Sequence, residues 1–214
     1  SIAEFTQFLD REGETIFIGI SSKLSATLNN ARLAGENLPS RSIHFIDSLN
    51  LSSGIGLLVL KAADLRSQGY SAGYIEQSVS QAIPKVHSSF VIDTLDYLYK
   101  GGRCSAMSMI VGSLLKIRPV IEVRSDGTLG VKEKITGSRK KALDSLIVDF
   151  QKHLLVMDTH RVFITHTGCH QDAQYLANEL LKLAAIENLH ITIAGATIAS
   201  HCGPNTIGIL YLTR

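Results

Sequence analysis

The feature that most constrains the fold is an alternation of apolar strands and amphipathic helices in the first third of the chain. Residues 15–20, Thr-Ile-Phe-Ile-Gly-Ile, carry no charge and are typical of a buried strand, and residues 24–38 place apolar side chains at helical spacing. A second short strand is predicted at 42–47, followed by helices at 55–68 and 71–83. Strands joined through helices pair in parallel, so this order predicts a parallel sheet covered by helices.

The second half of the chain mixes β–α units with a hairpin. The Asp126-Gly127 pair lies between two apolar stretches and is a strong hairpin turn signal. Pro84 marks a plausible boundary, so we expect two α/β domains, 1–84 and 85–214. The elements predicted for the second domain are strands at 86–94, 119–124, 128–133, 161–167, 190–199 and 206–212 and helices at 95–100, 106–115, 139–155 and 171–187.

A cluster of hydroxyl groups follows the first strand directly. Ser21 and Ser22 stand where the predicted helix at 24–38 should begin, and either is suited to be its N-cap. The first turn of a helix has free N–H groups and a partial positive charge, so this is a candidate site for a carboxylate or phosphate. The alternative is ordinary N-capping with no ligand, which is the commoner use of such residues.

Two further segments offer groups suited to an anion. Gly101 and Gly102 would let the backbone approach closely and aim Arg103 into a cleft, and arginine captures planar carboxylates in a bidentate way. The alternative is a helix end followed by a surface arginine. His201 stands in a polar turn predicted to end the strand at 190–199, where it would donate to an anion or serve a structural role.

Other polar groups carry weaker signals. A His-x-x-Cys-His stretch with a distant fourth cysteine resembles a metal cluster, but no second cysteine pair supports it, and we expect no metal there. These residues are His166, Cys169, His170 and Cys202. A basic run is interpreted as a solvated face or as a docking surface for an acidic or nucleotide-bearing partner. Its members are Lys132, Lys134, Arg139, Lys140 and Lys141.

Composition narrows the function classes. A net charge of +2 and an aromatic content of 6% do not favour a nucleic-acid partner. Three cysteines form no disulfide framework, no apolar segment has transmembrane length, and we expect a cytoplasmic protein. The chain begins abruptly at Ser1, which is suited to cap a helix but is not a typical translation start, so we expect an upstream segment to be missing.

Several stretches, taken in order, resemble the DegV family of bacterial fatty-acid-binding proteins. Each stretch is a weak signal alone, and their order over nearly the whole chain is specific. They are Ile20-Ser21-Ser22-Lys23-Leu24-Ser25-Ala26-Thr27, Ile46-Asp47-Ser48, residues 91–103 (Val-Ile-Asp-Thr-Leu-Asp-Tyr-Leu-Tyr-Lys-Gly-Gly-Arg), Lys116-Ile117-Arg118-Pro119-Val120, Asp126-Gly127, Lys132, Arg139-Lys140-Lys141-Ala142 and His201-Cys202-Gly203-Pro204.

The resemblance implies an α/β protein of two domains with a fatty acid in a cleft between them. It implies a carrier subunit, not itself an enzyme, that presents the carboxylate to an ATP-dependent fatty-acid kinase for acyl-phosphate formation and has no nucleotide site or cofactor. By motif match, Ser21, Ser22, Arg103 and His201 bind the carboxylate. The family's upstream Thr-Ser-x-Pro motif would precede Ser1.

The chain departs from the family pattern at three positions within its motifs. Ala26 and Asn205 stand where glycine is usual, and Cys202 replaces a usual threonine. The alternative functions are an autonomous phosphotransferase or hydrolase acting on a small anionic substrate, and a structural domain without ligand. No P-loop and no Gly-x-Ser-x-Gly elbow supports the first of these alternatives.

Overall fold

A computed structural model describes residues 1–103 and 117–214 and divides them into two compact units. The first unit is Ser1–Lys85 with Ser125–Thr128, and the second is Val86–Arg124 with Leu129–Arg214. The turn at 125–128 thus belongs to the first unit although the strands on either side of it belong to the second, which a single boundary at residue 84 did not anticipate. The predicted helix at 106–115 falls outside the described residues.

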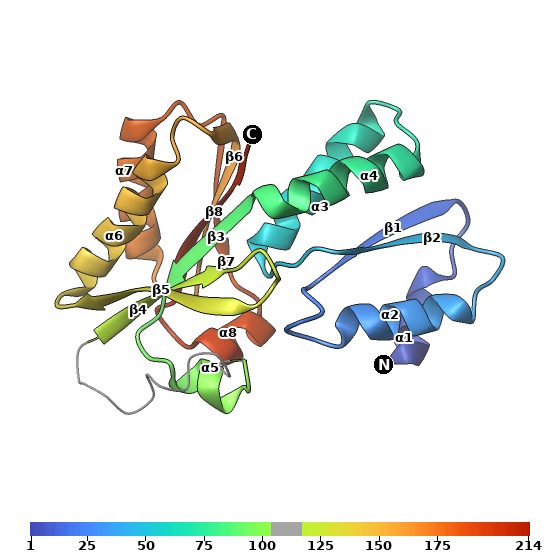
Figure 1. Cartoon of the computed structure of the whole chain (residues 1–214), viewed down its shortest axis with the longest axis horizontal. Helices are drawn as coiled ribbons and strands as arrows, with labels where there is room; N and C mark the ends of the chain where they lie inside the picture. The colour runs from blue at the N-terminus through green and yellow to red at the C-terminus, as the bar shows by residue number, and fades with distance from the viewer. Residues whose placement is uncertain (104–116) are drawn as a thin grey trace. The chain divides into compact units, whose positions relative to one another are not determined.

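The first unit is built on two parallel strands, β1 (Glu14–Gly19) and β2 (Ser42–Asp47), which pair in register from Glu14 opposite Ser42 to Gly19 opposite Asp47. Helices α1 (Ile2–Leu9) and α2 (Thr27–Glu36) lie on one side of this sheet, and α3 (Ser53–Ser67) and α4 (Ala72–Ala82) lie on the other, as Figure 1 shows. The predicted parallel β–α arrangement is confirmed.

The core of the first unit follows from the apolar spacing along its helices. On α2 the side chains of Leu28, Ala31 and Ala34 are fully buried, one helical turn apart, and face the sheet. Gly35 of the same helix lies against the ring of Phe45 on β2, where a methyl group would be too close. The two strands and α2 therefore pack at a distance that small residues set.

The second unit contains a six-stranded mixed sheet in the order β5-β4-β3-β8-β6-β7. All of its neighbouring strands are antiparallel except β6 and β7, which are parallel. The predicted hairpin is confirmed as β4 paired with β5. The strands are β3 (Val86–Val91), β4 (Ile117–Val123), β5 (Leu129–Thr136), β6 (Met157–His166), β7 (Asn188–Ile193) and β8 (Ile207–Thr213).

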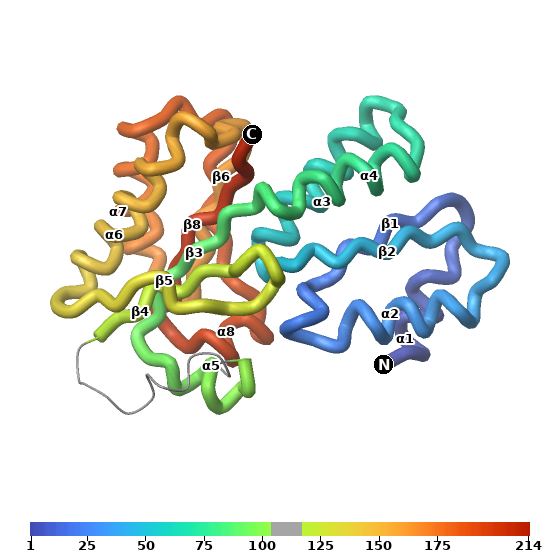
Figure 2. Tube along the Cα trace, in the orientation of Figure 1, coloured from blue at the N-terminus to red at the C-terminus, as the bar shows by residue number. Residues whose placement is uncertain are grey.

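Two long helices, α6 (Arg139–Lys152) and α7 (His170–Leu183), cover one face of this sheet, and their trace is clear in Figure 2. Together with the strands beneath them they enclose the hydrophobic core of the unit, which includes Phe150, Leu176 and Tyr211. The short helices α5 (Asp96–Lys100) and α8 (Ala196–Cys202) pack against each other, and a short 3-10 turn, Ile83–Lys85, precedes β3. No helix of the described residues has the length and apolar character needed to cross a membrane.

Candidate functional site

The first group of predicted site residues lies where β1 and β2 end. The Ser21 side chain is fully buried, and its hydroxyl donates to the Gly127 carbonyl at 2.8 Å and accepts from the Lys23 N–H at 3.2 Å. A methyl group at Gly127 would collide with this hydroxyl, so the close approach requires glycine. The Ser21 N–H donates to the Asn50 carbonyl. Ser21 therefore ties the end of β1 to two other loops.

Ser22 is exposed, and its surroundings differ from those that the sequence predicted. Its backbone N–H is 3.2 and 3.3 Å from the two carboxylate oxygens of Asp47, at the end of β2. Helix α2 begins only at Thr27, with Ala26 as its N-cap, so the prediction that Ser21 or Ser22 caps this helix is wrong. A turn formed by the Leu24 and Ser25 N–H groups donating to the Ser21 carbonyl comes first.

This arrangement changes how an anion would be bound at the end of β1. The backbone N–H of Ser22 already donates to a carboxylate of the protein itself, and that carboxylate also accepts from the Leu49 N–H at 3.1 Å. The side-chain hydroxyl of Ser22 is the remaining donor that this residue offers. The Ala26 backbone, with φ −74° and ψ 1°, lies in a region that alanine adopts without strain, although the family usually has glycine there.

The second group of predicted site residues lies around α5 and α8. Helix α5 ends at Gly101, Gly102 adopts a φ of 72°, and the exposed Arg103 follows. The Arg103 guanidinium donates back to the Gly101 carbonyl, which holds its side chain against the end of the helix. The positive φ at Gly102 is a conformation that glycine adopts readily, and it turns the chain at this point.

His201 lies on helix α8 and not in a turn after a strand, so the predicted strand at 190–199 is confirmed only as far as Ile193 and is wrong beyond it. Strand β7 ends at Ile193, Gly195 begins the helix, and Gly203 ends it with a φ of 83°. The β-branched Thr197 and Ile198 favoured a strand in the sequence, but the two glycines set the helix limits.

The Nδ1 atom of His201 is buried and has no hydrogen-bond partner among the described residues. It packs directly on Gly101, where a methyl group would lie 2.9 Å from the ring carbon Cε1 and closer still to Nδ1. The glycine before Arg103 therefore makes room for the imidazole of His201. The structure therefore brings the segment of Gly101 and Arg103 together with that of His201 in the second unit. Ser21 and Ser22 belong to the first unit.

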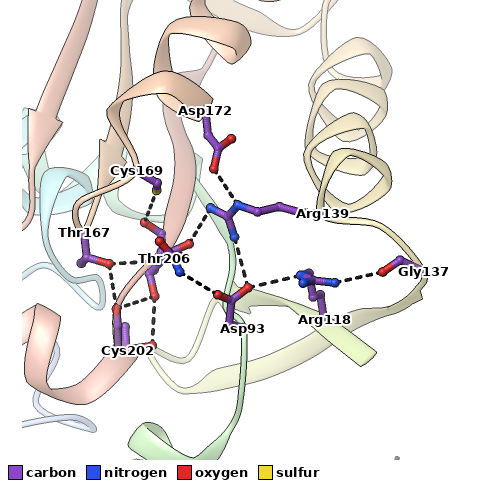
Figure 3. Close-up of polar contacts among 11 residues, drawn as sticks. Asp93, Arg118, Gly137, Arg139, Thr167, Cys169, Asp172, Cys202 and Thr206 are labelled. Carbon is purple, nitrogen blue, oxygen red and sulfur yellow. Dashed lines mark hydrogen bonds and ion pairs between the residues drawn. The ribbon is translucent and has the colours of Figure 1, made fainter. Parts of the chain in front are cut away.

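The residues after His201 are held by a dense set of hydrogen bonds, drawn in Figure 3. The Thr167 hydroxyl donates to the Gly203 carbonyl at 2.7 Å and accepts from the Thr206 N–H at 2.9 Å, and the Thr206 hydroxyl donates to the Cys202 carbonyl at 2.9 Å. Burial raises the pKa of the Cys202 thiol to about 11, so this side chain is a neutral packing group. The end of α8 is therefore rigidly anchored to the end of β6.

An ion-pair network that the sequence did not reveal connects three of the quoted motifs. Asp93, just after β3, accepts from Arg118 Nε and Arg139 Nη1, each at 3.2 Å, as Figure 3 shows. Arg139 also donates through Nε to Asp172 at 2.6 Å and through Nη2 to the Asn205 carbonyl at 2.8 Å. The network holds the loop after β3, β4, α6 and α7 in one arrangement.

The basic run is largely paired within the protein. Lys132 Nζ lies 2.6 Å from Asp149, Lys140 Nζ lies 2.9 Å from Asp144, and Arg139 is committed to the network just described. Pairing of this kind reduces the field available to an external anion, because these three positive charges already have counter-charges. These three ion pairs favour the interpretation as a solvated face over that as a docking surface.

The cysteines and histidines considered for a metal do not form a compact group among the described residues. The rings of His166 and His170 are 5.8 Å apart, and Cys169 is turned toward the Thr206 carbonyl at 3.5 Å. His166 is buried, and both of its ring nitrogens lack a hydrogen-bond partner in the described part of the chain. Burial lowers the pKa of His166, which favours the neutral imidazole.

Comparison with known proteins finds a family match that extends over the whole chain. The family model described as "Uncharacterised protein, DegV family" matches residues 1–214. A DegV domain-containing protein of Clostridium perfringens is 31% identical over 215 residues, which cover 99% of this chain and 74% of that protein. The chain therefore spans about three quarters of this relative.

Solved structures agree with the fold. A fatty acid binding DegV family protein from Streptococcus agalactiae matches with a TM-score of 0.87 at 29% identity, covering 100% of this chain and 77% of that one. The Streptococcus pneumoniae Fatty Acid Kinase (Fak) B3 protein, loaded with linoleic acid, matches with a TM-score of 0.90 at 25% identity, covering 100% and 76%. With the small parallel sheet, the larger mixed sheet and the ordered motifs, these matches show that the chain belongs to the DegV family.

Proposed function

We propose that this protein binds a long-chain fatty acid and presents its carboxylate to a partner kinase, which forms an acyl phosphate with ATP. The observation that carries the proposal is the pairing of His201 with Gly101 beside Arg103, which gathers a buried imidazole nitrogen without a partner and a guanidinium in one unit. Membership of a family whose solved members are described as fatty-acid-binding supports the ligand class.

The energetics suit such a ligand. A chain of about fifteen methylenes offers roughly 12 kcal/mol of gross transfer free energy at about 0.8 kcal/mol per buried CH₂. Ordering and association take back several kcal/mol, which leaves tight but reversible binding. The carboxylate has to be met by donors, because burying it unpaired is prohibitive.

We propose Ser22, Arg103 and His201 as the donors to the carboxylate, with Ser21 holding the turn that presents Ser22. The hydroxyl proton of Ser21 is already donated to Gly127, whereas the Ser22 hydroxyl is exposed. A Ser22→Ala variant should therefore lose affinity at unchanged stability, and Ser21→Ala should lose stability. Loss of affinity in Ser21→Ala at unchanged stability would instead place the Ser21 hydroxyl on the ligand.

The ligand is tested by extracting the purified protein with organic solvent and identifying fatty acids by mass spectrometry. We expect a long-chain fatty acid in stoichiometric amount, or its uptake when it is added to the extracted protein. A protein that is empty and takes up none would overturn the proposal. Turnover of an acyl or phosphoryl substrate without any partner would favour an autonomous enzyme.

The role of Arg103 is tested against a matched cation. Arg103→Ala should weaken phosphorylation of the bound acid by the kinase, since it removes a positive charge proposed to lie at the head group. Lys140→Ala is the control, because Lys140 is exposed and paired with Asp144 within its own helix. Equal losses of acid binding from both changes would argue against Arg103 at the carboxylate.

A further inference from the structure

A second cluster of polar side chains lies between α6 and the strands beneath it. It is formed by His87 of β3, Asp149 of α6 and His153 at the end of the same helix, and one ligand atom of each lies within 4.8 Å of the others. Asp149 is buried, and the two histidines are partly buried. None of these residues belongs to the motifs used above for fatty-acid binding.

The backbone places the three side chains on facing surfaces. Asp149 and His153 are four residues apart, so they lie on the same side of α6, one turn from each other. His87 pairs with Tyr211 in the antiparallel register of β3 and β8, and their rings stack at 4.8 Å. Tyr211 in turn contacts Phe150 of α6 edge-on at 5.4 Å. The strand histidine therefore faces the helix that carries the other two residues.

The hydrogen bonds around the cluster resemble the support that metal ligands receive. His153 Nδ1 is 2.9 Å from the Asp149 backbone carbonyl, which only accepts, so Nδ1 carries the proton and the neutral ring keeps a lone pair on Nε2. Metal-binding histidines are commonly oriented by such a bond from the other ring nitrogen. The Asp149 carboxylate accepts from Ser89 at 3.3 Å and from His87 at 2.9 Å.

An unsatisfied group beside the cluster is an independent sign of a missing partner. The Tyr211 hydroxyl is buried and has no hydrogen-bond partner among the described residues, whereas buried hydroxyls normally have one. A tyrosine hydroxyl is an ordinary hydrogen-bond donor, so the missing partner is an acceptor. A water molecule bound to an ion at the cluster would supply an acceptor.

We propose that His87, Asp149 and His153 form a binding site for a late first-row transition-metal dication such as Zn²⁺. Two imidazoles and one carboxylate are a ligand set that suits zinc and not magnesium or calcium. On binding, the His87 proton moves from Nε2 to Nδ1 and Nε2 turns its lone pair to the metal, with no net proton released. The metal joins the end of α6 to β3.

Lys132 sets the affinity of this site by competition. Its ammonium lies 2.6 Å from the second carboxylate oxygen of Asp149, and 26% of the side chain is exposed, so it has room to move outward. A dication has to share Asp149 with this positive charge or displace it. Removing the charge should therefore strengthen metal binding, whereas in a purely structural cluster the same change would only weaken the fold.

The test uses the full chain, treated with a chelator, dialysed and titrated with Zn²⁺ alone by calorimetry, with thermal unfolding measured at each ratio. We expect one saturable equivalent and a higher unfolding temperature. His153→Gln and His87→Gln should each weaken binding by more than about tenfold, the lower end of what losing even a supporting hydrogen bond costs at metal sites. Lys132→Met should tighten it.

His160→Gln is the matched control, because His160 is a more exposed histidine paired with Glu187 in the same unit. It should leave the Zn²⁺ affinity unchanged. Cobalt(II) should give the visible absorption of a four-coordinate site in the parent chain and lose it in His153→Gln. Zn²⁺ binding that is absent, or that falls equally in His160→Gln and His153→Gln, would overturn the proposal. A Lys132→Met chain that folds but binds no more tightly than the parent would also contradict it.

Discussion

The contact between Gly101 and His201 makes Gly101→Ala the most informative substitution. Gly101 has φ −75° and ψ −6°, a conformation that alanine adopts freely, so the backbone itself does not oppose the change. The new methyl group, however, would lie 2.9 Å from His201 Cε1 and 3.1 Å from the Tyr97 carbonyl oxygen. The methyl group would lie closer still to Nδ1, and such atoms normally approach only to about 3.5 Å, so the imidazole has to move by about 1 Å or more.

The expected magnitude follows from two opposing effects. Replacing glycine by alanine at a permitted backbone conformation stabilises a protein by about 0.4–1 kcal/mol through the unfolded chain. Overpacking of a filled site costs about 1–3 kcal/mol. We therefore expect a net loss of about 0.5–2 kcal/mol in the free energy of unfolding, measured by urea denaturation.

Gly73→Ala is the matched control for this effect. Gly73 lies in α4, and a methyl group there would meet nothing within 4 Å. This variant should be about 0.5–1 kcal/mol more stable than the parent, because alanine has the higher helix propensity. If Gly101→Ala is as stable as Gly73→Ala, the close packing of His201 on Gly101 is refuted.

Fatty-acid affinity gives a second readout for Gly101→Ala. A hydrogen bond to a charged group contributes about 1.5–3 kcal/mol, so displacing His201 from a carboxylate should weaken binding by about tenfold or more. If Gly101→Ala is destabilised but binds fatty acid as tightly as the parent, the packing of His201 on Gly101 is supported and the proposed contact of His201 with the carboxylate is refuted. The two readouts therefore separate the geometry from the proposed function.

Three further predictions concern the second unit. Although burial opposes ionisation, hydrogen bonds from its partners hold the pKa of Asp149 well below its usual range. The ionised carboxylate therefore stabilises the fold above about pH 4, and this stabilisation is lost at lower pH. The difference in free energy of unfolding between the parent and Asp149→Asn, measured by urea denaturation, should shrink as the pH falls from 6 to 3. Asn205 has a φ of 58°, a conformation that glycine adopts readily, and its side chain donates to Asp93 at 3.0 Å. Asn205→Gly should therefore lose only about 1 kcal/mol of stability, the contribution of that hydrogen bond. Asn205→Val should lose about 1–2 kcal/mol more, because valine opposes this backbone conformation, and thermal unfolding measures both losses. Ser138 caps α6 by accepting from the Lys141 N–H at 3.3 Å, and Ser138→Ala should cost about 1 kcal/mol by calorimetry, with no change in fatty-acid affinity.

The periodicity of apolar residues predicted most of the elements because it depends on local spacing. Helices α3, α4, α6 and α7 and the β4–β5 hairpin follow from apolar positions and from the Asp-Gly turn, which are properties of short segments. The first part of α8, residues 196–199, was mistaken for the end of a strand, since Thr197 and Ile198 are β-branched and the helix is short. Its helix is held by packing on α5, a contact with a distant part of the chain.

Which residues bind the ligand stays a prediction, but the structure corrects parts of their predicted local structure. Two segments were visible as sequence patterns. The hydroxyls lie at the polar end of strand β1, and the Gly-Gly-Arg segment lies at the end of a helix. The N-cap assigned to Ser21 or Ser22 failed because a turn closed on the Ser21 carbonyl comes first and α2 begins only at Thr27; the Ser22 N–H donates instead to Asp47, from the next strand. That bond depends on the parallel pairing of β1 with β2, which brings the two strand ends to one edge.

The sequence by itself determined the α/β class, the parallel pair in the first unit, the hairpin in the second and the family, because these depend on spacing and on ordered motifs. The tertiary structure alone decided which polar groups are already paired. It joined Asp93 to Arg118 and Arg139, placed His201 on Gly101, and gathered His87, Asp149 and His153 around one point. Such contacts join residues distant in the chain, and their geometry is fixed only when strands and helices pack, so no local pattern encodes them.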